Sequence, residues 1–437
     1  MIKQMPKYES YKDSGVEWLG EIPEHWSLIP NKRIFKLKKK LVGKRSSEYD
    51  LLSLTLKGIV KRDMDNPEGK FPAEFDTYQE VSSGDFVFCL FDVEETPRTV
   101  GLSKFDGMIT GAYAVFNPSE QYSREFLYYF YLNLDTGKKL KPLYKGLRNT
   151  ISKEAFFSFK TFVPPIDEQV KIASYLDKKT SQIDEAIAIK QKQIELLKER
   201  KKVIIQQAVT QGLNPDVPMK DSGVDWIGEI PEHWDTKKLK FVSHGFMYGT
   251  SVDCNSLESG TPVLRIPNID EITINLSDLK YANLSSDETK KYSLSKNDIL
   301  IIRTNGNPAL VGKSAIVDAD DLCLFASYLI KLTPKSNIEP SFLIRTMNSF
   351  SVRGALTYSA RTSAGNYNLN TQALGDCHIA FPPREEQIQI ADLVDRVSAK
   401  TDQSLALVTE QIAKLKEYKN TLINSAVTGK IKVTELA

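Results

Sequence analysis

The sequence repeats itself, and an internal repeat constrains the fold of a chain more strongly than any other feature of it. Residues 13–26 read DSGVEWLGEIPEHW and residues 221–234 read DSGVDWIGEIPEHW, so the two copies differ at only two positions. A second repeated block begins with Pro-Pro-x-x-Glu-Gln at residues 164–169 and again at residues 382–387, and both of its copies end in Ala-Val-Thr. The chain therefore consists of two halves that carry the same motifs in the same order.

Between the repeated blocks lie two variable segments, residues 27–163 and 235–381, which match each other only faintly. Short runs rich in β-branched and aromatic residues, bounded by Gly, Asn, Asp and Pro, predict a mixed α/β structure with many strands in each segment. We therefore expect one fold that carries two different surfaces. The clearest predicted strands are residues 85–90, 298–302 and 326–332.

The blocks that follow the Pro-Pro pairs are predicted to be long helices. Apolar residues recur every seven positions over six heptads in each block, which is typical of coiled-coil packing, and Lys201 and Lys419 occupy equivalent polar positions. We expect the two helices to pair with each other; the alternative is that each helix is buried in its own domain. The predicted helix seam consists of Leu176, Ile183, Ile187, Ile194, Leu197, Ile204, Val394, Leu405, Val408, Ile412, Leu415 and Leu422.

These patterns predict an α+β protein in which two long antiparallel coiled-coil helices separate two strand-rich domains, with a pseudo-two-fold internal repeat. The expected boundaries are 1–163 for the first domain, 164–213 for the central helix, 214–381 for the second domain and 382–437 for the C-terminal helix and tail. Because the tail after Thr428 occupies the place that the internal linker occupies after Thr210, we also expect it to lie beside residues 1–26.

Composition excludes several classes of protein. Apolar residues make up 41% and charged residues 26% of the 437 residues, which is ordinary globular usage. The longest apolar runs, residues 86–91 and 126–132, are far too short to cross a membrane, and no signal peptide precedes them, so we expect a cytoplasmic protein without a membrane partner. The net charge is only +2, so any affinity for nucleic acid must come from local clusters.

Motifs of metal binding and catalysis are missing. The four cysteines (Cys89, Cys254, Cys323 and Cys377) are far apart in sequence and predict buried, reduced thiols with no metal site. His25 and His233 could be paired catalytic bases, but every tryptophan of the chain lies in the same two repeats. We therefore interpret the histidines as orienting groups of a packed aromatic motif.

Nucleotide-binding motifs are also missing. Residues 306–314 resemble a phosphate-binding P-loop, but the loop is one residue too long and contains a proline that lacks an N–H, so we predict a surface loop between two strands. The chain contains neither a GxGxxG fingerprint nor an Asn-Pro-Pro-aromatic tetrapeptide. We expect no active site and no cofactor in this chain.

Basic and polar clusters remain as candidates for DNA contact. Residues 32–45 contain eight Lys and Arg side chains and no acid, although such a run is more often a solvated face. Loops rich in Gly, Asn and Arg occupy matching places in both variable segments, and Arg and Asn can read base edges, although turns favour the same residues. The candidate DNA-binding residues are Lys32, Arg33, Lys36, Lys38, Lys39, Lys145, Arg148, Asn149, Arg303, Asn305, Asn307, Lys313, Arg361, Asn366, Tyr367 and Asn368.

The duplicated order of motifs resembles the specificity subunit of type I restriction-modification systems, and the resemblance covers essentially the whole chain. It implies that each variable segment is a target recognition domain and that the chain itself is not an enzyme. It further implies double-stranded DNA, two methyltransferase subunits that use S-adenosylmethionine and, in the full complex, nuclease/translocase subunits that use ATP and Mg²⁺ as partners. Two alternatives are a coiled-coil scaffold that does not bind DNA and a single-chain restriction or modification enzyme.

Helix length supports the same interpretation. About 45 helical residues at a rise of 1.5 Å per residue form a rod of roughly 65–70 Å. Recognition domains at opposite ends of such a rod would reach one face of DNA if their half-sites lie roughly one helical turn apart. We therefore expect the helices to set the gap in a bipartite site whose two halves differ in sequence.

Overall fold

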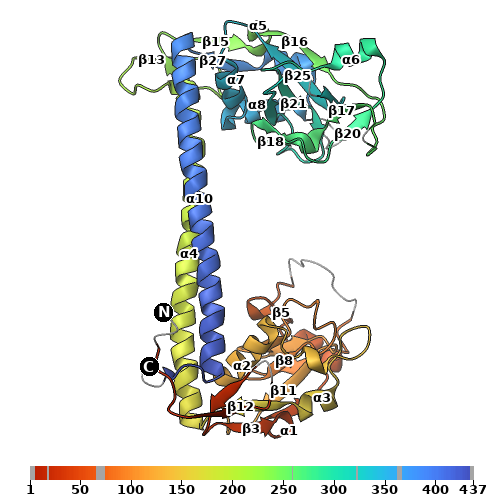
Figure 1. Cartoon of the computed structure of the whole chain (residues 1–437), viewed down its shortest axis with the longest axis vertical. Helices are drawn as coiled ribbons and strands as arrows, with labels where there is room; N and C mark the ends of the chain where they lie inside the picture. The colour runs from red at the N-terminus through yellow and green to blue at the C-terminus, as the bar shows by residue number, and fades with distance from the viewer. Residues whose placement is uncertain are drawn as a thin grey trace. The chain divides into compact units, whose positions relative to one another are not determined.

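The computed structural model describes residues 5–16, 19–64, 74–257, 259–320, 323–361 and 367–433. The chain divides into two compact units, each of which joins one variable segment to part of each long helix (Figure 1). Unit 1 contains residues 1–191 and 410–437, and unit 2 contains residues 192–409.

The two predicted long helices are present, as α4 (Ile166–Gln211) and α10 (Arg384–Val427). Each begins directly after its Pro-Pro pair and carries two acidic residues in its first turn, where the helix dipole favours negative charge. Gly212 and Gly429 follow the helix ends with φ angles of 78° and 71°, a left-handed conformation that glycine adopts without steric cost.

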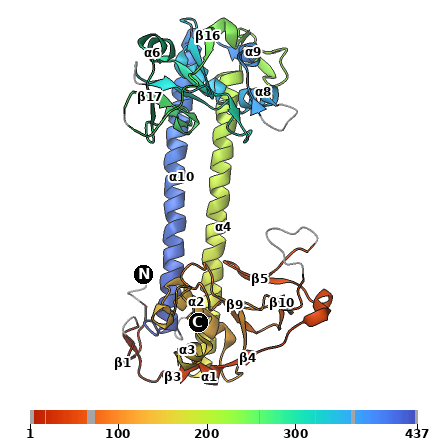
Figure 2. The ribbon, with the colours of Figure 1, turned by 90° about the vertical axis from the view of Figure 1, so that its right-hand side faces the viewer.

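The helices pair with each other in both units and run in opposite directions (Figure 2). In unit 1 the Nζ atom of Lys419 lies 2.6 Å from Asp184, and in unit 2 the Nζ atom of Lys201 lies 2.9 Å from Asp402. The two ion pairs are the same pair in the two repeats, shifted by 218 residues. All twelve predicted seam residues are buried or half-buried. Because the two helices pair in both units, the alternative of two separately buried helices is wrong.

The lysines at the seam give a first testable prediction. Reversing one charge with Lys201→Glu should lower the free energy of unfolding by about 0.5–1 kcal/mol, since Asp402 is half exposed and solvent screens the pair. Adding Asp402→Lys should restore most of that loss. A double-mutant cycle in urea measures the coupling, and a coupling of zero would remove the ion pair as a determinant of helix pairing.

Unit 1 is built on a four-stranded antiparallel sheet of order β4-β11-β8-β9. Its strands are β4 (Phe35–Lys38), β11 (Ala114–Pro118), β8 (Phe86–Phe88) and β9 (Val100–Leu102), and α2 (Arg124–Thr136) packs on it. The core is strongly aromatic, with Phe and Tyr rings at edge-to-face and tilted angles. Its other elements are β1 (Tyr11–Asp13), β2 (Glu21–Pro23), β3 (Ser27–Pro30), α1 (Asn31–Ile34), η2 (Gly43–Glu48), β5 (Leu52–Thr55), β6 (Gly58–Lys61), β7 (Gln79–Val81), β10 (Gly107–Ile109), η3 (Lys141–Leu143), α3 (Lys153–Ser158) and β12 (Lys160–Val163).

Unit 2 contains an equivalent four-stranded sheet of order β16-β25-β21-β23. Its strands are β16 (Ser243–Tyr248), β25 (Leu329–Pro334), β21 (Ile299–Ile302) and β23 (Ser314–Ile316). The other elements are β13 (Met219–Asp221), β14 (Glu229–Pro231), β15 (Asp235–Lys238), α5 (Leu239–Val242), β17 (Thr261–Leu264), η4 (Ile266–Asn268), β18 (Ile269–Asp270), β19 (Thr273–Ile274), β20 (Lys280–Ala282), α6 (Ser286–Tyr292), β22 (Thr304–Asn305), β24 (Leu324–Phe325), α7 (Pro340–Met347), α8 (Phe350–Ala360), β26 (Tyr367–Asn368), α9 (Thr371–Asp376) and β27 (His378–Phe381).

Corresponding strands occupy corresponding places in the two sheets, so the expectation of one fold used twice is confirmed. Two of the predicted strands match β8 and β21, but the predicted run at 326–332 is only partly correct, because β25 begins at Leu329. Residues 326–328 are a bridge and a turn between β25 and the preceding strand β24, which pairs with β17 in a different sheet. Hydrophobic composition alone does not distinguish one strand from two that belong to different sheets.

A half-buried lysine in unit 1 predicts a pH effect on stability. Lys139 donates to Asn424 of α10 at 2.7 Å, and burial together with nearby Lys430 lowers its pKa to about 8. Above pH 8 the folded protein binds fewer protons here than the unfolded chain, so this group makes stability rise with pH until the unfolded pKa near 10.4. In urea titrations, the difference in free energy of unfolding between Lys139→Met and the parent protein should narrow between pH 8 and 10. A difference that stays constant with pH contradicts the lowered pKa of Lys139.

Candidate nucleic-acid interface

The two repeated motifs contact each other through one glutamate in each unit. Glu168 accepts hydrogen bonds from the Tyr8 hydroxyl (2.5 Å) and the Trp26 indole N–H (3.2 Å), and lies 2.8 Å from the ring of His25. Glu386 binds the Trp234 indole N–H (3.0 Å) and the His233 ring (2.7 Å) in the same way. Trp26 and Trp234 are at most 1% exposed, and each histidine binds the same glutamate as its neighbouring tryptophan, as expected for a packed aromatic motif.

The neighbouring glutamine of each motif fixes the helix start to the variable segment. The side chain of Gln169 accepts from the Ser123 N–H, just before α2, and donates to the Pro164 carbonyl. Gln387 makes the equivalent bonds to the Glu339 N–H, just before α7, and to the Pro382 carbonyl. Both polar side chains are buried and satisfied, which explains the repeated Glu-Gln pair.

The C-terminal tail lies beside the first repeat, as predicted. The Lys432 N–H donates to the Pro6 carbonyl at 2.7 Å, and the Tyr11 hydroxyl donates to the Gly429 carbonyl at 3.2 Å. In unit 2, Gly212 lies against Trp234 just as Gly429 lies against Trp26. Each unit therefore closes the same junction between helix end and aromatic motif.

The candidate reading loops leave equivalent points of the two sheets. The Ile151 N–H donates to the Leu90 carbonyl at 2.8 Å in unit 1, and the Leu369 N–H donates to the Arg303 carbonyl at 2.8 Å in unit 2. The loops that precede these bonds, residues 145–150 and residues 361–368, differ in length and sequence. The same fold thus presents two different loops at one place.

In unit 1 two of the three predicted loop residues, Arg148 and Asn149, bind acidic side chains. Arg148 makes an ion pair of 2.5 Å with Asp92, which lowers the pKa of that carboxyl group. The amide of Asn149 donates to Glu95 at 3.2 Å, while Lys145 is exposed. The carboxylates hold Arg148 and Asn149 in place, and they would compete with DNA for the same donors.

The basic run of unit 1 contains four exposed candidate residues and one, Lys38, that pairs with a buried acid. Lys32, Arg33, Lys36 and Lys39 are exposed around α1 and β4. Lys38 instead points to the buried carboxylate of Asp85 at 2.8 Å and also donates to Ser82. Because turning Lys38 toward DNA would leave the buried Asp85 carboxylate without its counter-ion, Lys38 is not among the proposed DNA contacts.

In unit 2 the structure brings several predicted residues together at β22 and β26. The guanidinium of Arg303 lies 4.4 Å from the Tyr248 ring and donates to Asn368 at 3.0 Å. Across the two strands, Thr304 pairs with Asn368 and Asn305 pairs with Tyr367. Arg361 forms an isolated antiparallel β-bridge with Tyr367. Asn366 lies outside the described residues.

The remaining predicted residues have turn or backbone roles. The side chains of Asn305 and Asn307 accept from backbone N–H groups two residues further along, which is turn chemistry. Residues 306–313 join β22 to β23, as expected for a surface loop, and Lys313 donates to the Ile269 carbonyl at 3.1 Å. The structure therefore gives Lys313 a local partner rather than an open position.

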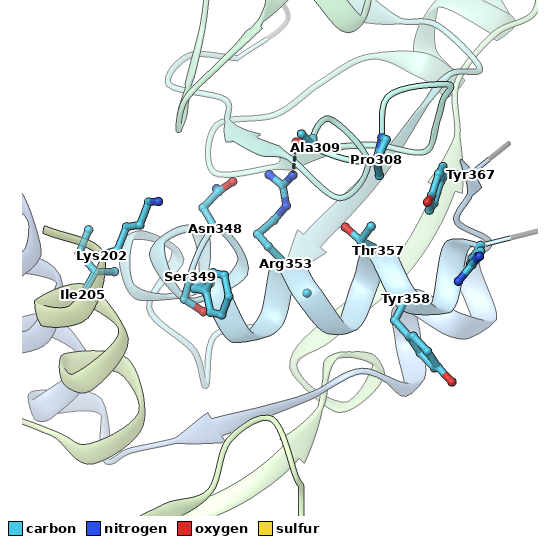
Figure 3. Close-up of a pocket in the computed structure, with 13 residues that line it drawn as sticks. Lys202, Ile205, Pro308, Ala309, Asn348, Ser349, Arg353, Thr357, Tyr358 and Tyr367 are labelled. Carbon is cyan, nitrogen blue, oxygen red and sulfur yellow. Dashed lines mark hydrogen bonds between the residues drawn. The ribbon is translucent and has the colours of Figure 1, made fainter. Parts of the chain in front are cut away.

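Beside these strands lies a cavity of about 810 Å³ that the sequence did not indicate (Figure 3). It lies between α8 and the Pro308–Ala309 loop, and Arg353 extends from α8 to donate to the Ala309 carbonyl at 2.7 Å. Lys202 and Tyr358 also line it. No local pattern marks these residues, because they come together from α4, a loop and α8.

The thiols and possible metal ligands offer no further site. Among the described residues no group of His, Cys, Asp or Glu could hold a metal ion, and no helix is long and apolar enough to cross a membrane. Cys89, Cys323 and Cys377 are buried thiols as predicted, whereas Cys254 is only partly buried. Burial raises the pKa of Cys323 to about 11 and that of Cys377 to about 12, so both thiols stay protonated.

Known proteins share this architecture. The chain is 22% identical to the EcoKI specificity subunit of Escherichia coli K12 over 94% of the chain and 90% of that protein. It is 29% identical to the MjaX specificity subunit of Methanocaldococcus jannaschii over 46% of the chain and 47% of that protein, or about half of each. The fold resembles that of the HsdS subunit of Thermoanaerobacter tengcongensis (TM-score 0.55, 15% identity, 94% of this chain and 98% of that chain).

A chain from a solved type I restriction-modification assembly is also similar in fold (TM-score 0.68, 13% identity, 93% of this chain and 98% of that chain). The family model described as "Type I restriction modification DNA specificity domain" matches residues 100–199 and 231–416, which is well over half of the chain. The chain therefore belongs to the family of type I restriction-modification DNA specificity subunits.

Proposed function

We propose that this chain selects the DNA sequence for a type I restriction-modification complex, and that each variable segment reads one half of a bipartite, asymmetric site. The observation that carries the proposal is the duplicated anchor: one sheet and one glutamate-tryptophan junction occur twice, and different loops leave the same point of each sheet. Two copies of one scaffold with different loops are suited to reading two different sequences.

The proposal assigns catalysis to partners. Two methyltransferase subunits with S-adenosylmethionine would modify the site, and nuclease/translocase subunits with ATP and Mg²⁺ would cleave in the full complex. The paired helices would set the gap between half-sites and dock the methyltransferase subunits. The seam and the Lys-Asp ion pairs support this role, because they hold α4 and α10 in a defined register in each unit.

Mapping methylated bases tests the proposal directly. The chain is produced with its methyltransferase partners in a host that lacks other modification enzymes, and the host DNA is sequenced for methylated adenine and cytosine. We expect one asymmetric motif with a fixed gap of unspecified bases. Methylation that does not depend on the chain would favour the scaffold, and activity of the chain alone would favour a single-chain enzyme.

Arg361 of unit 2 provides a sharper prediction. Its side chain is exposed at the end of α8 beside β26, so Arg361→Ala should weaken recognition of the second half-site by about 1–3 kcal/mol, or roughly tenfold to a hundredfold, and leave the first half-site unchanged. Arg396→Ala, at an exposed position on α10 of the same unit, is the matched control. Equal loss at both half-sites would assign Arg361 to general phosphate contact.

A further inference from the structure

Two cavities of unit 2 meet at Arg353 and form one groove. The first, of about 810 Å³, lies between α8 and the Pro308–Ala309 loop, and the second, of about 730 Å³, continues toward α10. Lys202, Asn348 and Arg353 line both of them, and the second cavity is also lined by the carboxylates Glu271, Asp395 and Asp402. The groove is large enough for a nucleotide-sized ligand, for which cavities of roughly 300–1,000 Å³ are usual.

Arg353 is a partly buried cation with no counter-ion among the described residues. Its one hydrogen bond goes to a carbonyl oxygen, and its Nε atom is buried without any acceptor in the described chain. Burial lowers its pKa to about 10, which reflects the cost of removing the charge from water. By contrast, Arg345 of the same unit is paired with Asp395. An anion in the groove would offset the cost at Arg353.

The rest of the first cavity has the same sign of charge. Lys202 and Arg361 line it together with Arg353, and no carboxylate does. Lys202 also lies 3.7 Å from the carboxylate of Glu199, one turn away on the exposed side of α4. The cavity is therefore suited to a negatively charged ligand.

Aromatic side chains flank these cations. Phe350 and Tyr358 of α8 are 77% and 83% exposed, and Tyr367 of β26 lies across the cavity from the helix (Figure 3). Exposed rings next to cations are the combination that binds single-stranded nucleic acid, because bases stack on the rings while the cations hold the phosphates. Tyr367 and Arg361 also belong to the candidate reading surface, so the groove continues from it.

We propose that the first cavity of this groove, which lacks the carboxylates of the second, binds a single unstacked nucleotide of a DNA strand, with its phosphate at Arg353 and its base against Tyr358 or Tyr367. The proposal rests on the proposed function, because it assumes that unit 2 meets DNA. A duplex is too wide to enter a groove of this volume, whereas one nucleotide that has left the base stack fits it. The groove would hold the strand beside the half-site rather than read its sequence.

Binding of a fluorescein-labelled twelve-residue oligothymidine to the full chain at low salt tests the groove. Arg353→Met should weaken binding about tenfold and should reduce the slope of log K against log salt by about 0.7, the value for one phosphate contact on a single strand. Arg396→Met is the matched control and should bind within twofold of the parent protein, since Arg396 is exposed on α10 outside the groove. Thermal unfolding of Arg353→Met should remain cooperative, because the variant removes a cation that has no counter-ion in the part of the chain that the structure describes.

Photo-cross-linking locates the base. The same oligonucleotide with one 5-iododeoxyuridine should cross-link to Tyr358 or Tyr367 on irradiation, as identified by mass spectrometry of tryptic peptides. Tyr358→Leu, which keeps an exposed apolar side chain without the aromatic ring, should lower the yield at least fivefold if Tyr358 carries the stack. A cross-link confined to unit 1 would overturn the proposal.

Two other outcomes are distinguishable. If Arg353→Met binds the oligonucleotide like the parent protein but no longer copurifies with the methyltransferase partner, the groove docks an acidic protein segment and the nucleotide proposal is wrong. If all variants retain the methylated motif and oligonucleotide binding, the groove proposal fails while the proposed function stands. If no motif depends on the chain at all, the proposed function fails whatever the oligonucleotide shows.

Discussion

Trp26→Ala is expected to lower the free energy of unfolding of unit 1 by about 3–5 kcal/mol, the usual cost of removing a buried aromatic side chain. Trp26 is 1% exposed, packs edge-on against Phe126 and Tyr8, and donates to Glu168. Its removal takes the ring from the point where the N-terminal repeat, α4 and the C-terminal tail meet. Hydrogen exchange measured for each unit reports the effect, which should appear in unit 1.

Matched variants separate the ring from its hydrogen bond. Trp26→Phe keeps most of the buried surface but leaves Glu168 without one donor, so about 1–3 kcal/mol is expected. Trp234→Ala should lower the free energy of unfolding of unit 2 as much as Trp26→Ala lowers that of unit 1, because Trp234 is equally buried. Trp226→Ala should cost less, because that ring is 39% exposed. If Trp26→Ala weakened protection in unit 2 as much as in unit 1, the two units would not be separate packing units.

The fragment 214–437 is expected to dimerise and, with the methyltransferase partner, to methylate an inverted repeat of the second half-site only. In the full chain, Ala208 and Val209 of α4 pack into the core of unit 2, and the fragment lacks them. Ala426 and Val427 of α10 occupy the equivalent place in unit 1, so a second copy of the fragment can supply what the first copy is missing. A two-fold symmetric reader requires a symmetric site.

Sequencing of the methylated products measures this outcome, and light scattering measures the mass of the fragment. Ala426→Asp should prevent dimerisation, because the residue would lie in the core of the partner copy and its charge would be buried without a counter-ion. A fragment that remains monomeric and still methylates, or one that keeps the asymmetric site, contradicts the account of two interchangeable halves.

The repeats and the heptads could be interpreted from the sequence because their signals are local. Seven-residue spacing follows from helix geometry, so it predicted both the seam and the pairing of α4 with α10. The repeated Pro-Glu-His-Trp motif predicted a packed aromatic cluster, and the structure adds its partner, the glutamate of the other repeated motif. Nothing in the spacing of Glu168 and Trp26 along the chain indicates that contact.

The sequence indicated the candidate reading loops, but it did not indicate the state of their side chains. Arg148 is held by Asp92, 56 residues away, and Arg303 by Asn368, 65 residues away. Lys38 belongs to a run that reads as exposed, yet it is paired with buried Asp85. Propensity and periodicity describe neighbours along the chain, whereas these pairings depend on which strands become adjacent in the sheet.

By itself, the sequence determined the duplicated architecture, the two long helices and the resemblance to specificity subunits, because each depends on order or period along the chain. Only the tertiary structure decided where charge is available. Arg353 looks like an ordinary helical arginine in the sequence. That it has no counter-ion among the described residues is evident only when α4, α8 and the Pro308–Ala309 loop enclose it. The physical reason is desolvation: the electrostatic role of a charged side chain depends on its surroundings in space, which the order of residues does not specify.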